Sequence, residues 1–225
     1  QGVGIHSGES SSVTFVPAPP NTGVHFVRKD LPGHPSIKVH ADSVTATGYA
    51  TTLGGEFFSV STIEHCLSAL SALRIDNLIV ELSGPEIPIC DGSSRDFLSA
   101  IQRVGVIEQD QPRKYCYVTQ PIYISEGDKQ AYVVPYHGLR VSVTIEFPHP
   151  QIGKQKLDLD INEQSFTREI ASARTFGFLR DVEALKSKGL AKGGSLENAI
   201  VLSDSGIINP EGLRFPDEFV RHKAL

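Results

Sequence analysis

The chain has 225 residues, 40% of them hydrophobic and 21% charged, so it can bury one large core or two smaller ones of about 100 residues each. This composition argues against a disordered chain. Its 21 Lys and Arg residues are outnumbered by 26 Asp and Glu residues, the net charge is -5, and no long basic run occurs. The charge pattern therefore indicates no nucleic-acid partner, although a few placed cations would suffice to bind an anionic small ligand.

The cysteines and the apolar segments indicate the compartment. Cys66, Cys90 and Cys116 are odd in number and form no Cys-x-x-Cys pair, which supports neither a disulfide framework nor a thiolate zinc cluster. No apolar stretch approaches the roughly 20 residues that span a bilayer, and the first residues do not resemble a signal peptide. We expect a soluble, cytoplasmic protein. The missing initiator Met and the end at Leu225 inside a predicted helix suggest a piece of a longer protein.

The first elements in chain order are two strands and a helix. Segments 12–16 and 24–29 are rich in β-branched and aromatic residues and flank the turn-forming PAPPNTG. Ser61 and Glu64 have the spacing of a capping box before a helix over 62–73. Apolar residues recur on one stripe of that helix: Ile63, Cys66, Leu67, Leu70 and Leu73.

A buried strand is predicted over 77–82 and a second helix over 95–105. The polar, proline-containing segment 107–114 has no periodicity and is the best boundary between domains. Beyond it the sequence predicts strands over 114–125, 130–136, 139–147 and 199–203, with helices near 166–173, near 180–188 and from Asp217. Because the same element types recur, we expect an α+β protein of two similar units, 1–108 and 114–225.

Glu64 and His65 are the first candidates for chemistry. On the predicted helix both lie away from the apolar stripe, and His65 shares its side with the small residues Ser68, Ala69 and Ala72, which leave room for another element or a ligand. A solvated Glu-His pair near a helix start explains the same pattern, since a carboxylate is favoured there by the helix dipole. The pair alone therefore does not decide between a site and a surface.

Two more candidates lie in the second half. His222 projects from the helix that opens at Asp217, and a zinc ligand or a surface histidine would both fit it, since the position four residues later falls beyond Leu225. Thr175 sits in ARTFGF, where its hydroxyl could hold an oxyanion or form a turn or cap. The glycine-containing loop 189–198 lacks the spacing of a phosphate-binding loop, so we expect a flexible or close-packed loop.

Several common catalytic patterns are missing. The sequence contains no G-x-S-x-G, no H-E-x-x-H and no carboxylate pair of recognisable spacing. It therefore gives no support to a serine hydrolase, a simple zincin or a glycosidase.

Six segments taken together resemble a known family. In order they are GVGIHSGE, STIEHCLSAL, PEIPICDGSS, SARTFGF, LAKGGSLENAIVL and NPEGLRFPDEFVRHKAL. Their order and separations are similar to those of the UDP-3-O-acyl-N-acetylglucosamine deacetylases, zinc amidases of lipid A biosynthesis, over essentially the whole chain. The resemblance implies two units, each a β-sheet packed with two helices, with the helices of both units facing each other.

The resemblance also implies roles for single residues. It makes His65 and His222 zinc ligands and Glu64 the general base, with Thr175 as the partner of the oxyanion. Lys223 would face the substrate diphosphate. Phe176 and Gly194 would line a passage for the acyl chain, and His6 matches a histidine near the site. The implied substrate is an acylated UDP-amino sugar; no protein partner is implied.

Two elements of the family would lie beyond Leu225. The resemblance places a third ligand, an aspartate, four residues after His222, and a histidine that protonates the leaving amine further downstream. With two ligands where catalytic zinc sites use three, we expect residues 1–225 alone to bind zinc poorly and to release little acetate. The rival readings are a non-catalytic relative that binds acylated sugar nucleotides and a metal-free structural domain. The Glu64-His65 pair argues against both, because neither needs a base beside a metal ligand.

Overall fold

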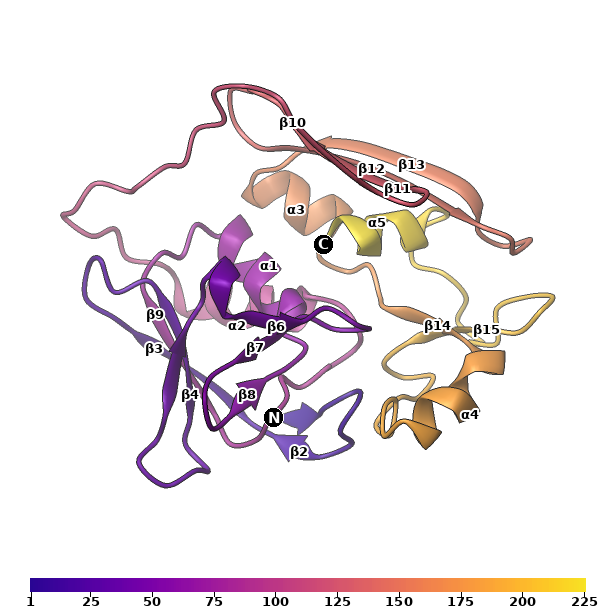
Figure 1. The fold of residues 1–225 in the computed structure, drawn as a ribbon, viewed down its shortest axis with the longest axis horizontal. Coiled ribbons are helices and arrows are strands. Elements are labelled where there is room, and N and C mark those ends of the chain that lie inside the picture. Colours follow the sequence, from indigo (N-terminus) through magenta and orange to yellow (C-terminus); the bar gives the residue numbers. More distant parts are fainter.

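The computed structural model describes residues 1–225 and is a mixed α+β structure (Figure 1). Alternating apolar residues of the first half form a four-stranded sheet in the order β3-β9-β4-β5, in which β9 pairs antiparallel with β3 and parallel with β4. A three-stranded sheet, β6-β7-β8, and the β1-β2 pair lie beside it. The strands are β1 (Gly2–Val3), β2 (Ser10–Ser11), β3 (Val13–Pro17), β4 (Val24–Arg28), β5 (Ser36–Lys38), β6 (Val44–Ala46), β7 (Thr52–Gly54), β8 (Ser59–Val60) and β9 (Leu78–Leu82), with a 3₁₀ turn at Ala41–Ser43.

Two helices and the four-stranded sheet bury the main core of the molecule. The helices are α1 (Glu64–Ala72) and α2 (Arg95–Val104), and they pack against each other. The core cluster contains 20 buried residues, among them Phe26, Leu70, Val80 and Leu98. The strands predicted over 12–16, 24–29 and 77–82 are confirmed as β3, β4 and β9, and the helix over 95–105 as α2.

The capping box predicted for the first helix is wrong. The helix begins at Glu64, and no side chain caps it. Ser61 instead forms a parallel β-bridge with Glu86, and Thr62 adopts a left-handed φ of 58° that turns the chain into the helix. Pairing with a distant segment therefore replaces the local capping that the spacing suggested.

The second half consists of two-stranded sheets and three short helices. Its helices are α3 (Glu163–Glu169), α4 (Leu179–Ser187) and α5 (Glu218–Ala224). Phe166, Ile170 and Ala171, in and after α3, belong to the main core, whereas a smaller cluster of four buried residues holds Ile152, Ile200, Leu202 and Phe219. The strands are β10 (Ile122–Glu126), β11 (Lys129–Val133), β12 (Arg140–Phe147), β13 (Gly153–Asp160), β14 (Phe176–Phe178) and β15 (Ile200–Leu202).

The strand predictions for this half are partly wrong. Residues 114–121 form no strand, so only the end of the predicted 114–125 strand exists as β10. The sequence analysis missed β13, whose exposed lysines and aspartates hide the alternation of Leu157 and Leu159, and it missed β14, which pairs parallel with β15. The helix expected near 166–173 is α3, which begins earlier because Asn162 and Ser165 form a capping box.

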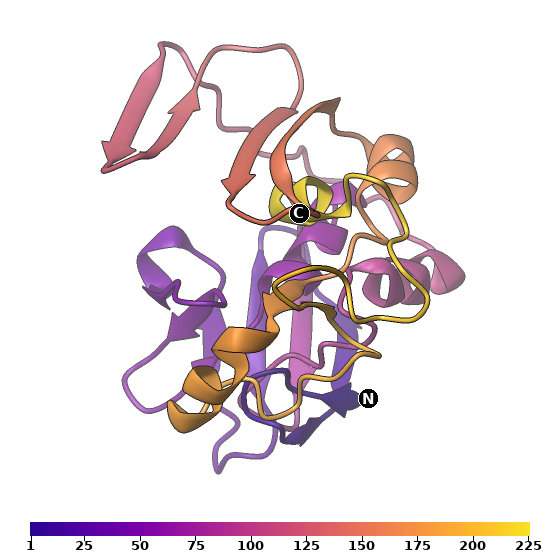
Figure 2. The ribbon, with the colours of Figure 1, turned by 90° about the vertical axis from the view of Figure 1, so that its right-hand side faces the viewer.

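The β10-β11 hairpin stands away from the rest of the molecule (Figure 2). All its residues are exposed, including the side chains of Ile122, Tyr123, Ile124 and Tyr132. By contrast, β12 and β13 present alternate residues to α5, which packs against both strands. None of the five helices has the length and apolar run that crossing a bilayer requires.

Candidate active site

The first wall of the site is the start of α1. His65 is only 3% exposed, and Ser68 and Ala69 on the same side of the helix are also buried. The alternative of a solvated Glu-His pair at the surface, which the sequence left open, therefore does not apply. Glu64 is partly exposed, and its carboxylate accepts a hydrogen bond of 3.0 Å from the Thr51 amide. Burial raises the pKa of Glu64, with the hydrogen bonds from backbone amides acting in the opposite direction.

The second wall is α5, which carries His222. The ring centroids of His222 and His65 are 5.3 Å apart, so residues separated by most of the chain meet. Phe219 and Val220, on the same helix, are fully buried and fix it against the second half. Asp217 stands at the N-cap position, as expected, but its side chain does not cap the helix and pairs with Arg221 instead.

Both imidazoles are held uncharged. Burial lowers the pKa of His65 to about 4, while Asp91 and the backbone of Ser93 act the other way. Burial, His65 and Lys223 lower the pKa of His222 well below its usual range. The Nδ1 atoms of His65 and His222 are buried and make no hydrogen bond of regular geometry. Neutral imidazoles with uncommitted nitrogens are what a metal ion requires of histidine ligands.

A buried ion pair joins α5 to the segment that carries Thr175. The Arg174 guanidinium and its backbone amide both donate to the Glu218 carboxylate over 2.9 Å, and the two side chains are 2% and 0% exposed respectively. The Thr175 amide donates to the Gly92 carbonyl over 2.7 Å. The backbone of Thr175 is thus held by Gly92, and the neighbouring Arg174 is bound to Glu218 on the helix that carries His222.

Lys223 and Phe176 lie beside the histidines. The Lys223 ammonium stands 5.4 Å from the centroid of the Phe176 ring, and that ring meets His222 edge-on with centroids 6.3 Å apart. Lys223 is exposed, yet partial desolvation lowers its pKa, and the negative charge of Glu64 opposes this shift. The cation and the carboxylate therefore lie within electrostatic reach of each other.

His6 and Gly194 meet on the other side of the site. The His6 carbonyl accepts from the Lys192 amide at 3.2 Å, and the His6 ring accepts from the Ala191 amide at 3.4 Å. Gly194 lies against Ile5, so its contacts are with the N-terminal loop. Of the two readings left open for the 189–198 loop, close packing is confirmed at this end.

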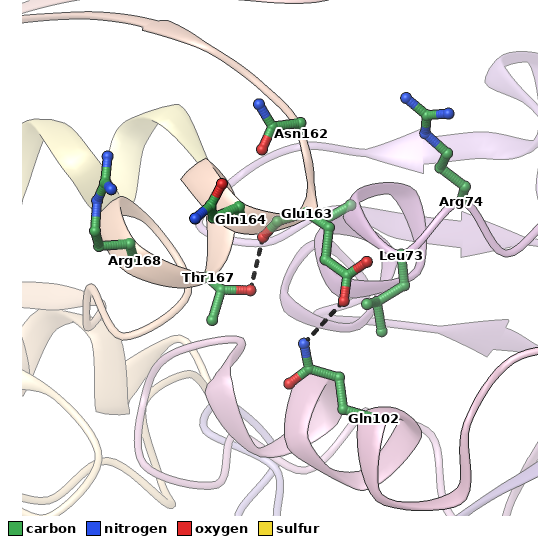
Figure 3. A pocket seen from close by; sticks show the side chains of 9 residues that line it. Leu73, Arg74, Gln102, Asn162, Glu163, Gln164, Thr167 and Arg168 are labelled. Carbon is green, nitrogen blue, oxygen red and sulfur yellow. Dashed lines mark hydrogen bonds between the residues drawn. The ribbon is translucent and has the colours of Figure 1, made fainter.

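The structure thus brings Glu64, His65, His222, Lys223 and Phe176 together, with Thr175 and His6 held close by. No three His, Cys, Asp or Glu side chains are grouped closely enough to hold a metal by themselves. A hollow of about 730 Å³ lies elsewhere, between the end of α1, α2 and the start of α3 (Figure 3), and none of these residues lines it. Most of its lining side chains are polar, with Ala72 and Leu73 as the hydrophobic ones, and Gln102 donates to Glu163 over 3.1 Å.

Sequence reasoning missed three polar residues that hold the site: Glu86, Arg174 and Glu218. All three are buried. Each lay inside a segment that carries the family resemblance, and Arg174 and Glu218 stand one residue before Thr175 and four residues before His222. Charged residues next to candidate site residues in largely apolar segments were the available signal.

A comparison with protein families matches residues 1–225 to the family described as UDP-3-O-acyl N-acetylglycosamine deacetylase. The chain belongs to this deacetylase family. The match covers all of the elements that form the two walls, and it confirms the resemblance inferred from the six sequence segments.

Curated relatives bear the corresponding name, UDP-3-O-acyl-N-acetylglucosamine deacetylase. The protein of Bdellovibrio bacteriovorus is 70% identical over 225 residues, which are 100% of this chain and 74% of the relative. That of Myxococcus xanthus is 53% identical over 225 residues, 100% of this chain and 72% of the relative. That of Shewanella halifaxensis is 46% identical over 227 aligned residues, 100% of this chain and 74% of the relative. The deacetylases it resembles are therefore longer than this chain.

Proposed function

We propose that the full-length protein hydrolyses the N-acetyl group of UDP-3-O-acyl-N-acetylglucosamine to acetate and a free amine, in lipid A biosynthesis. The observation that carries the proposal is the meeting of the Glu64-His65 pair on α1 with His222 on α5, 5.3 Å between imidazole centroids, in a member of this deacetylase family. A non-catalytic relative that binds acylated sugar nucleotides would not need a carboxylate beside two uncharged imidazoles.

The residues present fit a zinc ion. His65 and His222 are close together and neutral, and each has a buried ring nitrogen without a protein partner. Imidazole nitrogen is a preferred zinc ligand, and we propose that these two side chains hold the ion. A zinc ion bound there would lower the pKa of a water molecule toward about 7 and polarise the amide carbonyl.

The chain's own groups then move the proton and stabilise charge. Glu64 accepts the proton of the attacking water, and its raised pKa brings it closer to the range where a base works well near neutral pH. As the new C–O bond forms, the Thr175 hydroxyl donates to the carbonyl oxygen that becomes negative. The C–N bond then breaks and its electron pair goes to the nitrogen, which takes a proton from the downstream histidine that the family resemblance implies. The products are the amine and acetate, which keeps the oxygen of the attacking water.

Substrate recognition is proposed for four further residues. Lys223 is exposed beside Phe176 and offers a cation to the diphosphate. Phe176 and Gly194 lie within the segment 176–200, which contains apolar residues beside small ones and which we propose houses the acyl chain. His6 closes this segment from the N-terminal side through its bonds to Ala191 and Lys192.

The test is Glu64→Gln in the full-length protein, with acetate release as the assay. Loss of a general base is expected to lower kcat by about 10²-fold or more while bound zinc, measured by metal analysis, stays unchanged. Glu81→Gln on β9, where the side chain pairs with Lys29, is the matched control and should keep full activity. Near wild-type turnover of the zinc-loaded Glu64→Gln protein would remove Glu64 from the mechanism.

Lys223→Ala tests the diphosphate contact separately. It should raise the KM for the nucleotide sugar and weaken the dependence of KM on salt, because an exposed charge-charge attraction is screened by ions. Zinc content should not change. An equal loss with a substrate that lacks the uridine diphosphate would contradict the assignment.

The two-unit organisation and the compartment are also proposals. We divide the chain into units 1–108 and 114–225, each with sheet and helices, as the recurrence of elements suggests. Limited proteolysis should then cut first within 107–114, which has no regular structure. The three cysteines are free, and this supports the proposal of a reducing, cytoplasmic compartment.

A further inference from the structure

Glu86 is a buried carboxylate that no cation neutralises. It is 2% exposed, and its charge is met only by neutral donors. The Thr62 hydroxyl donates to Oε1 over 2.7 Å and the His6 amide to the same oxygen over 3.0 Å, while the Ser7 amide donates to Oε2 over 2.7 Å. Burial alone would raise the pKa of Glu86, but these hydrogen bonds outweigh it and hold the pKa below the usual range. The carboxylate is therefore charged at neutral pH.

One set of these contacts reaches the catalytic helix. Thr62 is β-branched and has a φ of 58°, a conformation that such residues rarely adopt. Its hydroxyl is bound by Glu86, and the backbone of the neighbouring Ser61 pairs with the segment around Glu86 through bonds to Pro85 and Ile87. Glu64 begins the helix two residues later. The contacts of Ser61 and Thr62 with Glu86 and its neighbours thus fix the direction in which α1 begins.

The other set reaches the N-terminal loop, residues 4–8, and through it the second half. The Ile5 and His6 carbonyls accept from the amides of Gly193 and Lys192, over 3.1 and 3.2 Å. The packing leaves no space on either side: a Cβ on Gly4 would clash with the Glu86 carboxylate, and a Cβ on Gly193 would clash with the Gly4 carbonyl. Glu86 therefore contacts the N-terminal loop, and the N-terminal loop in turn contacts the 191–194 segment.

We propose that Glu86 is a positioning residue for the deacetylation, because its carboxylate binds the start of the catalytic helix and the N-terminal loop at once and so holds the 191–194 segment against the site. Only the expected effect on acyl-chain discrimination rests on the proposed function; the contacts of Glu86 do not. Since that segment belongs to the proposed acyl site, Glu86 acts on how strongly the enzyme discriminates between acyl chains, although it does not contact the substrate.

The experiment uses the full-length protein with Glu86→Gln, and Glu81→Gln on β9 as the matched control, because Glu81 pairs with Lys29 at the surface. An amide side chain keeps the shape of Glu86 but loses an acceptor oxygen and the charge, so at least one backbone donor is left unsatisfied. Hydrogen exchange by mass spectrometry follows peptides that cover 189–196, with peptides of α4 as an internal reference.

We expect exchange of the 191–193 amides to rise about tenfold or more in Glu86→Gln, the size that loss of a hydrogen bond to a charged group gives, and to stay unchanged in Glu81→Gln. In steady-state assays KM for a long-acyl substrate should rise while KM for a short-acyl substrate and the zinc content hold. Gly193→Ala, which separates the same loops from the other side, should reproduce both effects.

Wild-type exchange at 191–193 in a folded Glu86→Gln protein would overturn the proposal. If that variant does not fold, Thr62→Val removes one donor and keeps the side-chain shape, and Thr62→Ser restores the hydroxyl; equal exchange in these two would overturn it as well. An exchange effect without any change in acyl-chain discrimination would refute the kinetic part. The exchange result does not depend on catalysis. Absence of acetate release by the zinc-loaded wild-type protein would therefore reject the proposed function and leave this coupling standing.

Discussion

The two walls of the site are stabilised by different physics. The α1 wall lies in a core cluster of 20 buried residues, so its position follows from apolar packing on several sides. The α5 wall packs mainly on a smaller cluster of four buried hydrophobic residues, with Ala224 and Leu225 at its end reaching the main core, and the ion pair of Arg174 with Glu218 adds a polar contact. One site can therefore be built half by the hydrophobic effect and half by polar groups taken out of water.

This difference determines how each wall fails. Removing atoms from a packed core costs in proportion to the cavity that remains, so damage at α1 is graded. Removing one partner of a buried ion pair leaves a bare charge behind, which is far worse than removing both. We therefore expect single substitutions of the ion pair behind α5 to lower the free energy of unfolding more sharply than single substitutions in the core behind α1.

The largest expected effect is that of Arg174→Met. The Glu218 carboxylate is 0% exposed and would be left buried without its guanidinium partner, which should lower the free energy of unfolding by about 3–5 kcal/mol. Urea unfolding followed by circular dichroism measures this. The double variant Arg174→Met/Glu218→Gln carries no stranded charge and should regain part of the loss. A double variant less stable than the single one would refute this account of the α5 wall.

Next in size is Thr175→Val, which keeps the shape of the side chain and removes its hydroxyl. If the hydroxyl stabilises the developing oxyanion, kcat should fall by about 10²–10³-fold with little change in KM. Thr175 is held by its backbone bond to Gly92, so the fold should be unaffected and the unfolding curve should match that of the wild type. A change confined to KM would place Thr175 in substrate binding instead.

The third prediction concerns pH and Glu86. Its pKa is below the usual range in the folded state, so below a pH of about 4.5 the unfolded chain binds more protons than the folded one. The free energy of unfolding should therefore fall as the pH decreases through this region, by at most about 1.4 kcal/mol per pH unit from this group. Urea titrations at several pH values should show a shallower decline for Glu86→Gln. If the free energy of unfolding declined equally with falling pH in the wild type and in Glu86→Gln, this prediction would be wrong.

The smallest effect is expected in the β10-β11 hairpin. Tyr123 is 72% exposed, and its ring has Tyr132 as a neighbour, with centroids 6.1 Å apart. Tyr123→Ser should change the stability of residues 1–225 by no more than about 0.5 kcal/mol, since exposed positions without special contacts tolerate substitution. A loss of several kcal/mol would mean that the hairpin supports the second half far more than its burial indicates.

The sequence predicted the elements whose stabilisation is local or strongly patterned. The β-branched and aromatic runs of β3 and β4, the apolar run of β9 and the helical period of α2 lie where expected. Predictions failed where tertiary contacts decide. Lys154, Lys156 and Asp158 disguised β13, and residues 114–121 have strand-like composition but no strand to pair with.

For the site, the sequence identified the candidate residues but not what holds them. Glu64, His65 and His222 were found from helix position and family resemblance, and the structure brings them together. The capping box failed because Ser61 and Thr62 are bound by a segment 24 residues away, a relationship that spacing within one helix cannot reveal. Buried charge pairs such as that of Arg174 and Glu218 are equally invisible without the fold, since their residue types usually occur at the surface.

The contact between His6 and Ala191 joins residues 185 positions apart, and this has a consequence for synthesis. Residues 4–8 leave the ribosome about 185 residues before their docking partner, the 191–194 segment. At roughly 5–20 residues per second, the loop waits about 10–40 s before the 191–194 segment can receive it. During this interval the Ile5 and His6 carbonyls lack their native donors, so chaperones have reason to engage the nascent protein at residues 4–8.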